Sequence, residues 1–269
     1  MVITTNITNI LLSLTFVLIF QMQINGIALA SVVAEIIGMI IGFIYVWKEL
    51  QKFQGKWIYK EIVRLNAYKR FIQININLFL RTIALIFTFA FITAQGARFG
   101  GIILGANALL MNLQNLLAYV LDGFAHAAEA LVGKAVGKKD TRLFKSAVHI
   151  CLKWSVYIAL IFALIYILTG KYIISLMTHH QNIRDIAIEY LPWIIISPIV
   201  SVWSFLYDGV FVGATRSRDM RNAMLGSLFL VFLPSWYFLQ PLENHGLWLA
   251  FTLFMFSRGL SMHLLYKRI

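Results

Sequence analysis

The sequence has few charged side chains and almost no cysteine. Charged residues make up 13% of its 269 positions, about half of the roughly 25% found in soluble domains. The single cysteine, Cys151, cannot form an intramolecular disulfide bond, and no cysteine and histidine residues have the spacing of a zinc site. These shortages argue against a soluble domain, a disulfide framework and a structural metal, and the sequence implies no cofactor.

Acidic residues are especially scarce. Eleven Asp and Glu face 23 Lys and Arg, which gives a formal net charge of +12. On a soluble protein this excess would suggest a basic surface for nucleic acid. Here the basic residues lie between long apolar runs, so no nucleic-acid partner is expected. The sequence also has no phosphate-binding glycine loop and no nucleophile elbow, so we do not expect an enzyme.

Apolar residues, by contrast, are abundant at 60% of the chain. They form eight windows of about 20 residues, which is long enough to cross a bilayer as a helix. The windows are 7–22, 27–47, 75–97, 107–133, 147–168, 187–212, 223–240 and 246–265. We therefore predict an all-α integral membrane protein with eight transmembrane helices, surrounded by membrane lipids.

The distribution of lysine and arginine predicts the orientation. The loops after the second, fourth and sixth windows and the C-terminal tail carry 17 of these residues, whereas the alternate loops carry three. Basic short loops stay cytoplasmic, so both termini should be cytoplasmic in a bacterial inner membrane. Arg81, Lys153 and Arg258 lie inside windows toward their cytoplasmic ends, where we expect their side chains to reach the headgroups.

The longest polar connection, 48–70, has basic residues at every fourth position. They are Lys48, Lys52, Lys56, Lys60 and Arg64. This spacing would place them along one stripe of a helix lying on anionic lipid. A solvated linker with interspersed charges is the alternative interpretation.

Two hairpins of the sequence share a short repeat. Residues 25–30 (NGIALA) and 245–250 (HGLWLA) both contain Gly-aliphatic-x-Leu-Ala at the start of a window. Transporters are commonly built from two repeated halves. If the two hairpins correspond, residues 1–47 are the last two helices of an N-terminal lobe, 48–70 a basic cytoplasmic linker and 71–269 a complete six-helix C-terminal lobe. Four helices would then be absent, and a separate N-terminal fragment would be a partner. A genuine eight-helix protein is the alternative.

Three segments resemble one known family. They are residues 93–100 (TAQGARFG), 121–137 (LDGFAHAAEALVGKAVG) and 203–216 (WSFLYDGVFVGATR). These motifs resemble the multidrug and toxic compound extrusion (MATE) family, and specifically its DinF branch. The resemblance covers essentially the whole chain. It implies two six-helix bundles around a central cavity, and export of small organic cations or drugs in exchange for protons or Na⁺. A non-transporting remnant or scaffold, or a lipid-linked saccharide flippase of the same superfamily, would be the alternatives.

The chain departs from the family at two positions. The resemblance implies a coupling carboxylate on the first helix of the DinF branch, and that helix lies outside this sequence. It implies another on the seventh helix of the sodium-coupled branch, but the matching window 75–97 contains no Asp or Glu. Neither coupling role can be transferred to this chain.

Asp208 is the first candidate for ion coupling. It lies near the cytoplasmic end of a window that contains Pro192 and Pro198, which favour bending. A carboxylate in the membrane can take up a proton and release it when its cavity rehydrates. By resemblance, it lies near the acidic position of the family's tenth helix. A static ion pair with Arg216, or a bond from a backbone donor, is the alternative.

Asp122, His126 and Glu129 form a second candidate group. Their i, i+4, i+7 spacing places all three on one helix face if the helix continues past residue 121. On that face they could hold or relay a proton. Otherwise they form the helix end and pair with lysines of the following loop.

Aromatic side chains are candidates for substrate contact, because aromatic faces attract organic cations. The candidates are Trp203, Phe205, Tyr207 and Tyr119. Packing against lipid or core is the alternative for each. Gln114 belongs to a group of amides between 107 and 115 that should hydrogen-bond between helices or line a polar cavity. Gly209 and Gly213 offer a small face for close helix packing, or a hinge.

Overall fold

The computed structural model describes residues 2–52 and 65–267, and these residues form helices joined by short turns. The chain divides into two compact units, Met1–Arg64 and Leu65–Ile269. Most of the predicted amphipathic stripe falls on residues 53–64, which lie outside the described residues. Of its members, Lys48 lies in the last turn of a membrane-type helix and Lys52 pairs with Glu49 at 2.7 Å.

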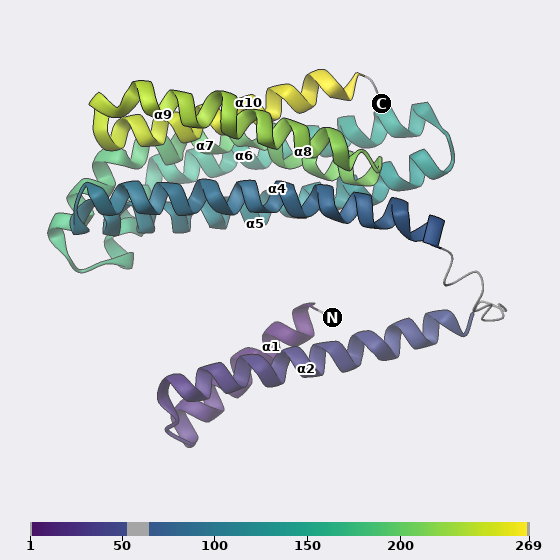
Figure 1. The fold of residues 1–269 in the computed structure, drawn as a ribbon. Coiled ribbons are helices and arrows are strands. Elements are labelled where there is room, and N and C mark those ends of the chain that lie inside the picture. Colours follow the sequence, from purple (N-terminus) through teal and green to yellow (C-terminus); the bar gives the residue numbers. More distant parts are fainter. Residues whose placement is uncertain (1, 53–64, 268–269) are drawn as a thin grey trace. The chain divides into compact units, whose positions relative to one another are not determined.

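The first unit is a helical hairpin. Helix α1 (Val2–Leu14) continues into a π-helical turn, η1 (Thr15–Ile19), and the chain then reverses into α2 (Gln23–Leu50) (Figure 1). The buried residues of α2 recur at every fourth position and are small: Gly26, Ala30, Ala34 and Gly38. The Asn9 side-chain amide donates to the Ser31 hydroxyl at 3.0 Å. Two apolar helices therefore meet along a thin stripe of small residues, with a hydrogen bond between Asn9 and Ser31.

The second unit contains the remaining helices, which run side by side (Figure 1). In chain order they are α4 (Leu65–Arg98), α5 (Gly101–Gly137), α6 (Thr141–Met177), α7 (Gln181–Gly213), α8 (Ser217–Gly226), the π-helical η2 (Ser227–Phe232), α9 (Leu233–Leu239), the short η3 (Gln240–Leu242) and α10 (Glu243–Tyr266). The turns after α5 and α7 and the end of α10 lie at one end of the unit, and the other turns lie at the opposite end. The basic loops that follow α5 and α7 thus lie at the first of these ends.

Local chemistry explains where these helices begin. Asp140 caps α6, because its Oδ1 atom accepts the backbone N–H groups of Arg142 and Leu143 at 2.9 Å. Between α4 and α5, Gly100 has a φ of +113°, a conformation that glycine adopts without a steric penalty.

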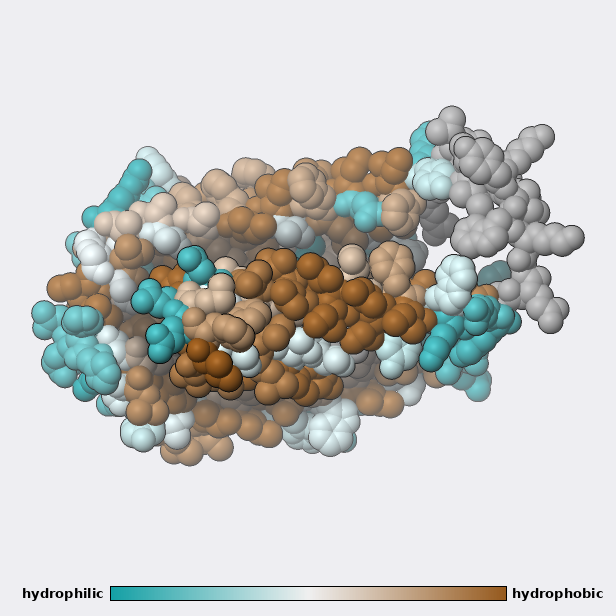
Figure 2. Space-filling view, turned by 90° about the horizontal axis from the view of Figure 1, so that it is seen from below, coloured by the Kyte–Doolittle hydropathy of each residue, from teal (hydrophilic) through white to brown (hydrophobic). Residues whose placement is uncertain are grey.

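Six helical stretches among the described residues are long and apolar enough to cross a membrane. The last two predicted windows both fall within one of them, Ser217–Tyr266, and the first window falls on the shorter apolar stretch Ile3–Ile19. The long stretch reverses at Glu243, which has a φ of +48°, and α10 packs back against α9, η2 and α8. The predicted all-helical membrane fold is confirmed, whereas the number of eight crossings stays a prediction. On the face shown in Figure 2, hydrophobic side chains cover most of the surface and hydrophilic ones gather mainly toward the helix ends.

Helix α7 forms the centre of the second unit and packs against α5, α6 and α10. It continues through Pro192 and Pro198 without a break. A Cβ atom on Gly209 would overlap the Ala125 carbonyl, and one on Gly213 would lie 2.5 Å from the Glu129 carbonyl oxygen. The two glycines therefore allow α5 and α7 to approach backbone to backbone, which confirms the close-packing interpretation.

The two hairpins with the sequence repeat also share their local geometry. In each, a residue with positive φ, Gln23 (+46°) or Glu243 (+48°), starts the second helix. Three residues later a buried glycine, Gly26 or Gly246, lies against the preceding arm. That arm contains a π-helical segment in both cases, at the end of α1 in the first hairpin and between α8 and α9 in the last. These shared features support the predicted internal repeat.

Candidate functional site

An open cavity of about 350 Å³ lies between α4, α5, α7 and α10. Six ionisable side chains line it: Arg81, Asp122, His126, Glu129, Asp208 and Arg258. Between them lie apolar and aromatic residues, including Phe89, Phe205 and Met255. All four sequence-derived candidates for ion coupling thus contribute to one cavity, although they come from two different helices.

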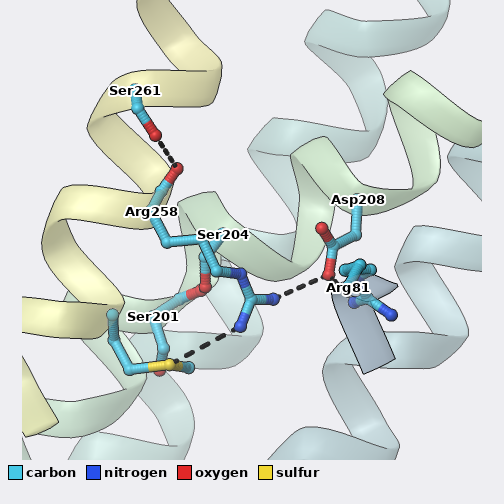
Figure 3. Close-up of polar contacts among 7 residues, drawn as sticks. Arg81, Ser201, Ser204, Asp208, Arg258 and Ser261 are labelled. Carbon is cyan, nitrogen blue, oxygen red and sulfur yellow. Dashed lines mark hydrogen bonds and ion pairs between the residues drawn. The ribbon is translucent and has the colours of Figure 1, made fainter. Parts of the chain in front are cut away.

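Asp208 is the centre of an ion-pair cluster. Its Oδ2 atom accepts a hydrogen bond from the Arg258 guanidinium at 2.6 Å and a second from the Arg81 guanidinium (Figure 3). The three residues belong to α7, α10 and α4, so the carboxylate connects three helices. Because both arginines converge on one oxygen, Asp208 Oδ1 has no hydrogen-bond partner among the described residues. Charge-assisted bonds of this kind are the strongest hydrogen bonds in proteins.

Arg258 is buried, with a relative exposure of 1%. Its guanidinium lies 5.6 Å from the centre of the Phe205 ring and contacts the Met255 sulfur at 3.7 Å. Its backbone carbonyl accepts the Ser261 hydroxyl (Figure 3). The prediction that this side chain reaches the headgroups is therefore wrong. The reason is that α10 continues two turns beyond Arg258, which leaves the buried carboxylate as the nearest partner for its charge.

Arg216 is not the partner of Asp208. It pairs instead with Asp219 at 2.8 Å, one turn later at the start of α8. The predicted ion pair between Asp208 and Arg216 is therefore wrong. The sequence-adjacent arginine forms a local pair, and arginines from distant helices reach the buried carboxylate.

The acidic face of α5 forms as the spacing predicted, because α5 continues to Gly137. Asp122, His126 and Glu129 all line the cavity, and His126 Nδ1 lies 3.5 Å from Glu129 Oε2. Within the described residues, no lysine of the following loop forms an ion pair with them. Asp122 and Glu129 are half-buried and His126 is exposed, so all three face the cavity rather than a salt-bridged helix end.

Two of the predicted substrate-contact residues lie in the cavity wall. Phe205 lines it beside Arg258, and Gln114 lines it from α5. Gln114 is buried and its Oε1 atom accepts the Ser197 hydroxyl, one residue before Pro198. This bond between α5 and α7 is the interhelical contact expected of that amide.

The other three aromatic candidates lie outside the cavity wall. Tyr119 is 74% exposed on the outer surface of the second unit. Trp203 lines a separate shallow pocket with Gly259 and His263, and the buried Tyr207 has its hydroxyl 2.6 Å from His263 Nδ1. Trp203 and Tyr207 are four residues apart, so they share a face of α7 that points to the end of α10.

Sequence reasoning missed the two arginines of the cluster. A signal was present, because Arg81 and Arg258 are isolated arginines within apolar windows, and such residues usually face a partner or a water-filled cavity. The prediction that both side chains reach the headgroups did not take this into account. The described residues contain no group of three or more His, Cys, Asp and Glu placed to hold a metal ion.

Comparison with known proteins identifies the class of protein. Residues 78–238 match the sequence model of the MatE family. The chain therefore belongs to the MatE family, whose members are transporters and not enzymes. This confirms the resemblance drawn from the three motifs.

Individual relatives agree with this assignment. The chain is 40% identical to DNA damage-inducible protein F of Escherichia coli over 98% of its own length and 57% of that protein. It is 23% identical to Protein DETOXIFICATION 42 of Arabidopsis thaliana over 94% of the chain and 48% of that protein. The chain thus spans about half the length of these curated relatives.

Solved structures share the fold. The Vibrio cholerae MATE transporter VcmN in the bent form has a TM-score of 0.83 at 19% identity, covering 99% of this chain and 60% of that one. The eukaryotic MATE transporter AtDTX14 has a TM-score of 0.88 at 14% identity, with 99% and 60% covered. The family and the apolar helices together support a multi-pass inner-membrane protein.

Proposed function

We propose that this chain is part of a secondary antiporter that exports small organic cations or drugs in exchange for protons or Na⁺. In this proposal residues 1–47 form the last hairpin of an N-terminal lobe, 48–70 the linker and 71–269 a complete C-terminal lobe. The chain crosses the membrane eight times. The end that carries the basic loops faces the cytoplasm, because short basic loops are retained there.

The cavity of the second unit is the observation that carries the proposal. Its wall combines three carboxylates, Asp122, Glu129 and Asp208, with the aromatic rings of Phe89 and Phe205. Carboxylates attract a positive charge, and aromatic faces and apolar side chains accommodate the rest of an organic cation. The same carboxylates are groups to which a proton or Na⁺ can bind.

The charge of the cavity favours this proposal over a flippase for lipid-linked saccharides. A flippase would need a wide cationic cavity for its phosphates. Here two arginines face three carboxylates, which leaves one formal negative charge when His126 is neutral. An organic cation suits that balance better than a phosphate does.

The three carboxylates have different roles in this proposal. Asp208 compensates the charges of Arg81 and Arg258, because removing it would take from both arginines the carboxylate to which they are bonded. Asp122 and Glu129, with His126 beside them, are bonded to no arginine of the described residues and are open to the cavity. They exchange the coupling ion as the cavity opens alternately to the two sides of the membrane.

The test is uptake of the fluorescent cation ethidium into vesicles that contain the 269-residue chain. An imposed proton or sodium gradient should drive uptake, and combining Asp122→Asn with Glu129→Gln should reduce the initial rate at least about tenfold. The matched control is Asp185→Asn, which changes an exposed carboxylate at the opposite end of α7.

The outcomes separate the candidate functions. Equal rates for the double variant and for Asp185→Asn would remove these carboxylates from the mechanism. Absence of gradient-driven uptake by the unmodified chain would favour a non-transporting remnant.

A further inference from the structure

The two arginines that bind Asp208 are held in different ways. We propose that Arg81 competes with the cationic substrate for the cavity, whereas Arg258 is the permanent partner of Asp208. This inference rests on the proposed function, because it concerns the cation site of the same cavity. It assigns Arg81 a role in setting substrate affinity.

Arg258 is fixed by its surroundings. Only 2% of its side chain is exposed, and Phe205, Met255 and Asp208 contact its guanidinium from different sides. Removing this guanidinium from the carboxylate would require repacking of the core between α7 and α10. Its positive charge is therefore a constant feature of the site.

Arg81 reaches the same carboxylate through the cavity. Its side chain is 21% exposed, and among the described residues Asp208 is the one hydrogen-bond partner of its guanidinium. Its Nε atom is buried and has no hydrogen-bond partner in the described part of the chain. Helix α4, which carries it, packs mainly against α8 and α5, so few other contacts hold Arg81 beside α7. Of the two arginines, Arg81 is thus the one that can move without disturbing the core.

A bound organic cation and the Arg81 guanidinium would occupy the same part of the cavity. Both are attracted by the carboxylates of Asp208, Asp122 and Glu129, and two positive charges at short range repel each other. Substrate binding must then displace Arg81 from Asp208. The free energy of breaking that ion pair lowers the apparent affinity for the cation. When the substrate leaves, Arg81 returns and closes the site against rebinding.

The experiment measures equilibrium binding of ethidium to the purified 269-residue chain in detergent. Arg81→Gln raises the negative charge of the cavity from one to two and removes the competitor, so the Kd should fall about tenfold. Arg81→Lys keeps the charge, so its Kd should lie closer to that of the unmodified chain than to that of Arg81→Gln. Arg98→Gln is the matched control, because it removes an arginine from the exposed outer end of α4. It should leave the Kd unchanged.

A second measurement protects the test against a variant that folds poorly. In Arg81→Ala, free guanidinium ion should enter the vacated space and compete with ethidium. The guanidinium ion should therefore weaken ethidium binding several-fold more in this variant than in the unmodified chain. Arg81→Gln and Arg81→Ala are first compared with the unmodified chain by gel filtration, which shows whether they are folded.

The possible failures can be told apart. If the unmodified chain binds ethidium but Arg81→Gln binds it equally or more weakly, Arg81 is not a competitor and the proposed function stands. If neither the unmodified chain nor Arg81→Gln binds the cation, both proposals fall together.

Discussion

The first hairpin, α1–α2, and the last, α8–α10, share the same local geometry at their turn. They differ in how many of their side chains are buried. At equivalent positions of the repeat, Gly26 and Gly246 are both buried, as are Ala30 and Ala250. On the other faces the two hairpins differ. Small residues therefore set how two helices meet, whereas the other helices of the bundle determine which further side chains become core.

The position after Ile27 and Leu247 shows the difference most clearly. In the last hairpin it is Trp248, which is buried and donates its indole N–H to Asn107 at 2.9 Å. In the first hairpin it is Ala28, which is exposed within its own unit. At the same position of the repeat, the last hairpin thus has a large side chain buried among other helices. The first hairpin has a small side chain there, which is exposed within its own unit.

The largest predicted effect removes that anchor. Trp248→Ala should lower the free energy of unfolding by about 3–5 kcal/mol, through the cavity it creates and the loss of the bond to Asn107. The measurement is unfolding in detergent followed by circular dichroism. Ile27→Ala in the first hairpin is the control and should cost less than about 1 kcal/mol, because that side chain is half exposed. Similar losses of unfolding free energy at both sites would contradict the difference in burial between the two hairpins.

A medium effect is expected at the two equivalent glycines. A Cβ on Gly246 would overlap the Leu239 backbone carbonyl, whereas one on Gly26 would lie 2.9 Å from the Met22 Cβ, a side-chain atom. Gly246→Ala should therefore cost about 2 kcal/mol and Gly26→Ala about 1 kcal/mol in the same unfolding assay. Gly123→Ala, where a Cβ meets no atom within 4 Å, is the control that should not destabilise the chain. A reversed order would mean that the first hairpin is packed more tightly than the last.

The smallest effect concerns the polar bond of the first hairpin. Asn9→Ala should cost about 0.6 kcal/mol, the average of interhelical hydrogen bonds in membranes. Asn9→Ala, Ser31→Ala and the double variant form a cycle that isolates this bond. A coupling energy near zero would mean that this bond does not help to specify the hairpin.

Periodicity predicted those parts of the site that lie on one helix. The face of Asp122, His126 and Glu129 and the contact through Gly209 and Gly213 follow from positions along a single helix, and both were found as expected. Such a pattern fixes a direction around the helix axis. It does not identify the residue on the neighbouring helix that meets it.

The ion-pair cluster could not be predicted for this reason. Asp208 is 127 residues from Arg81 and 50 residues from Arg258, whereas the rejected partner Arg216 is eight positions away in the sequence. The position of Tyr207 outside the cavity wall has a different cause. Tyr207 and Asp208 are neighbours in sequence, but a helix turns about 100° between them, so one faces His263 and the other the cavity.

The backbone contact between α5 and α7 limits how this lobe can change shape. Because Gly209 and Gly213 press directly on the α5 backbone, those two helices cannot slide or tilt past one another without a steric clash. Both walls that bear the carboxylates therefore behave as a single rigid body. A change in the width of the cavity therefore requires a movement of α4, and Arg81 moves with that helix.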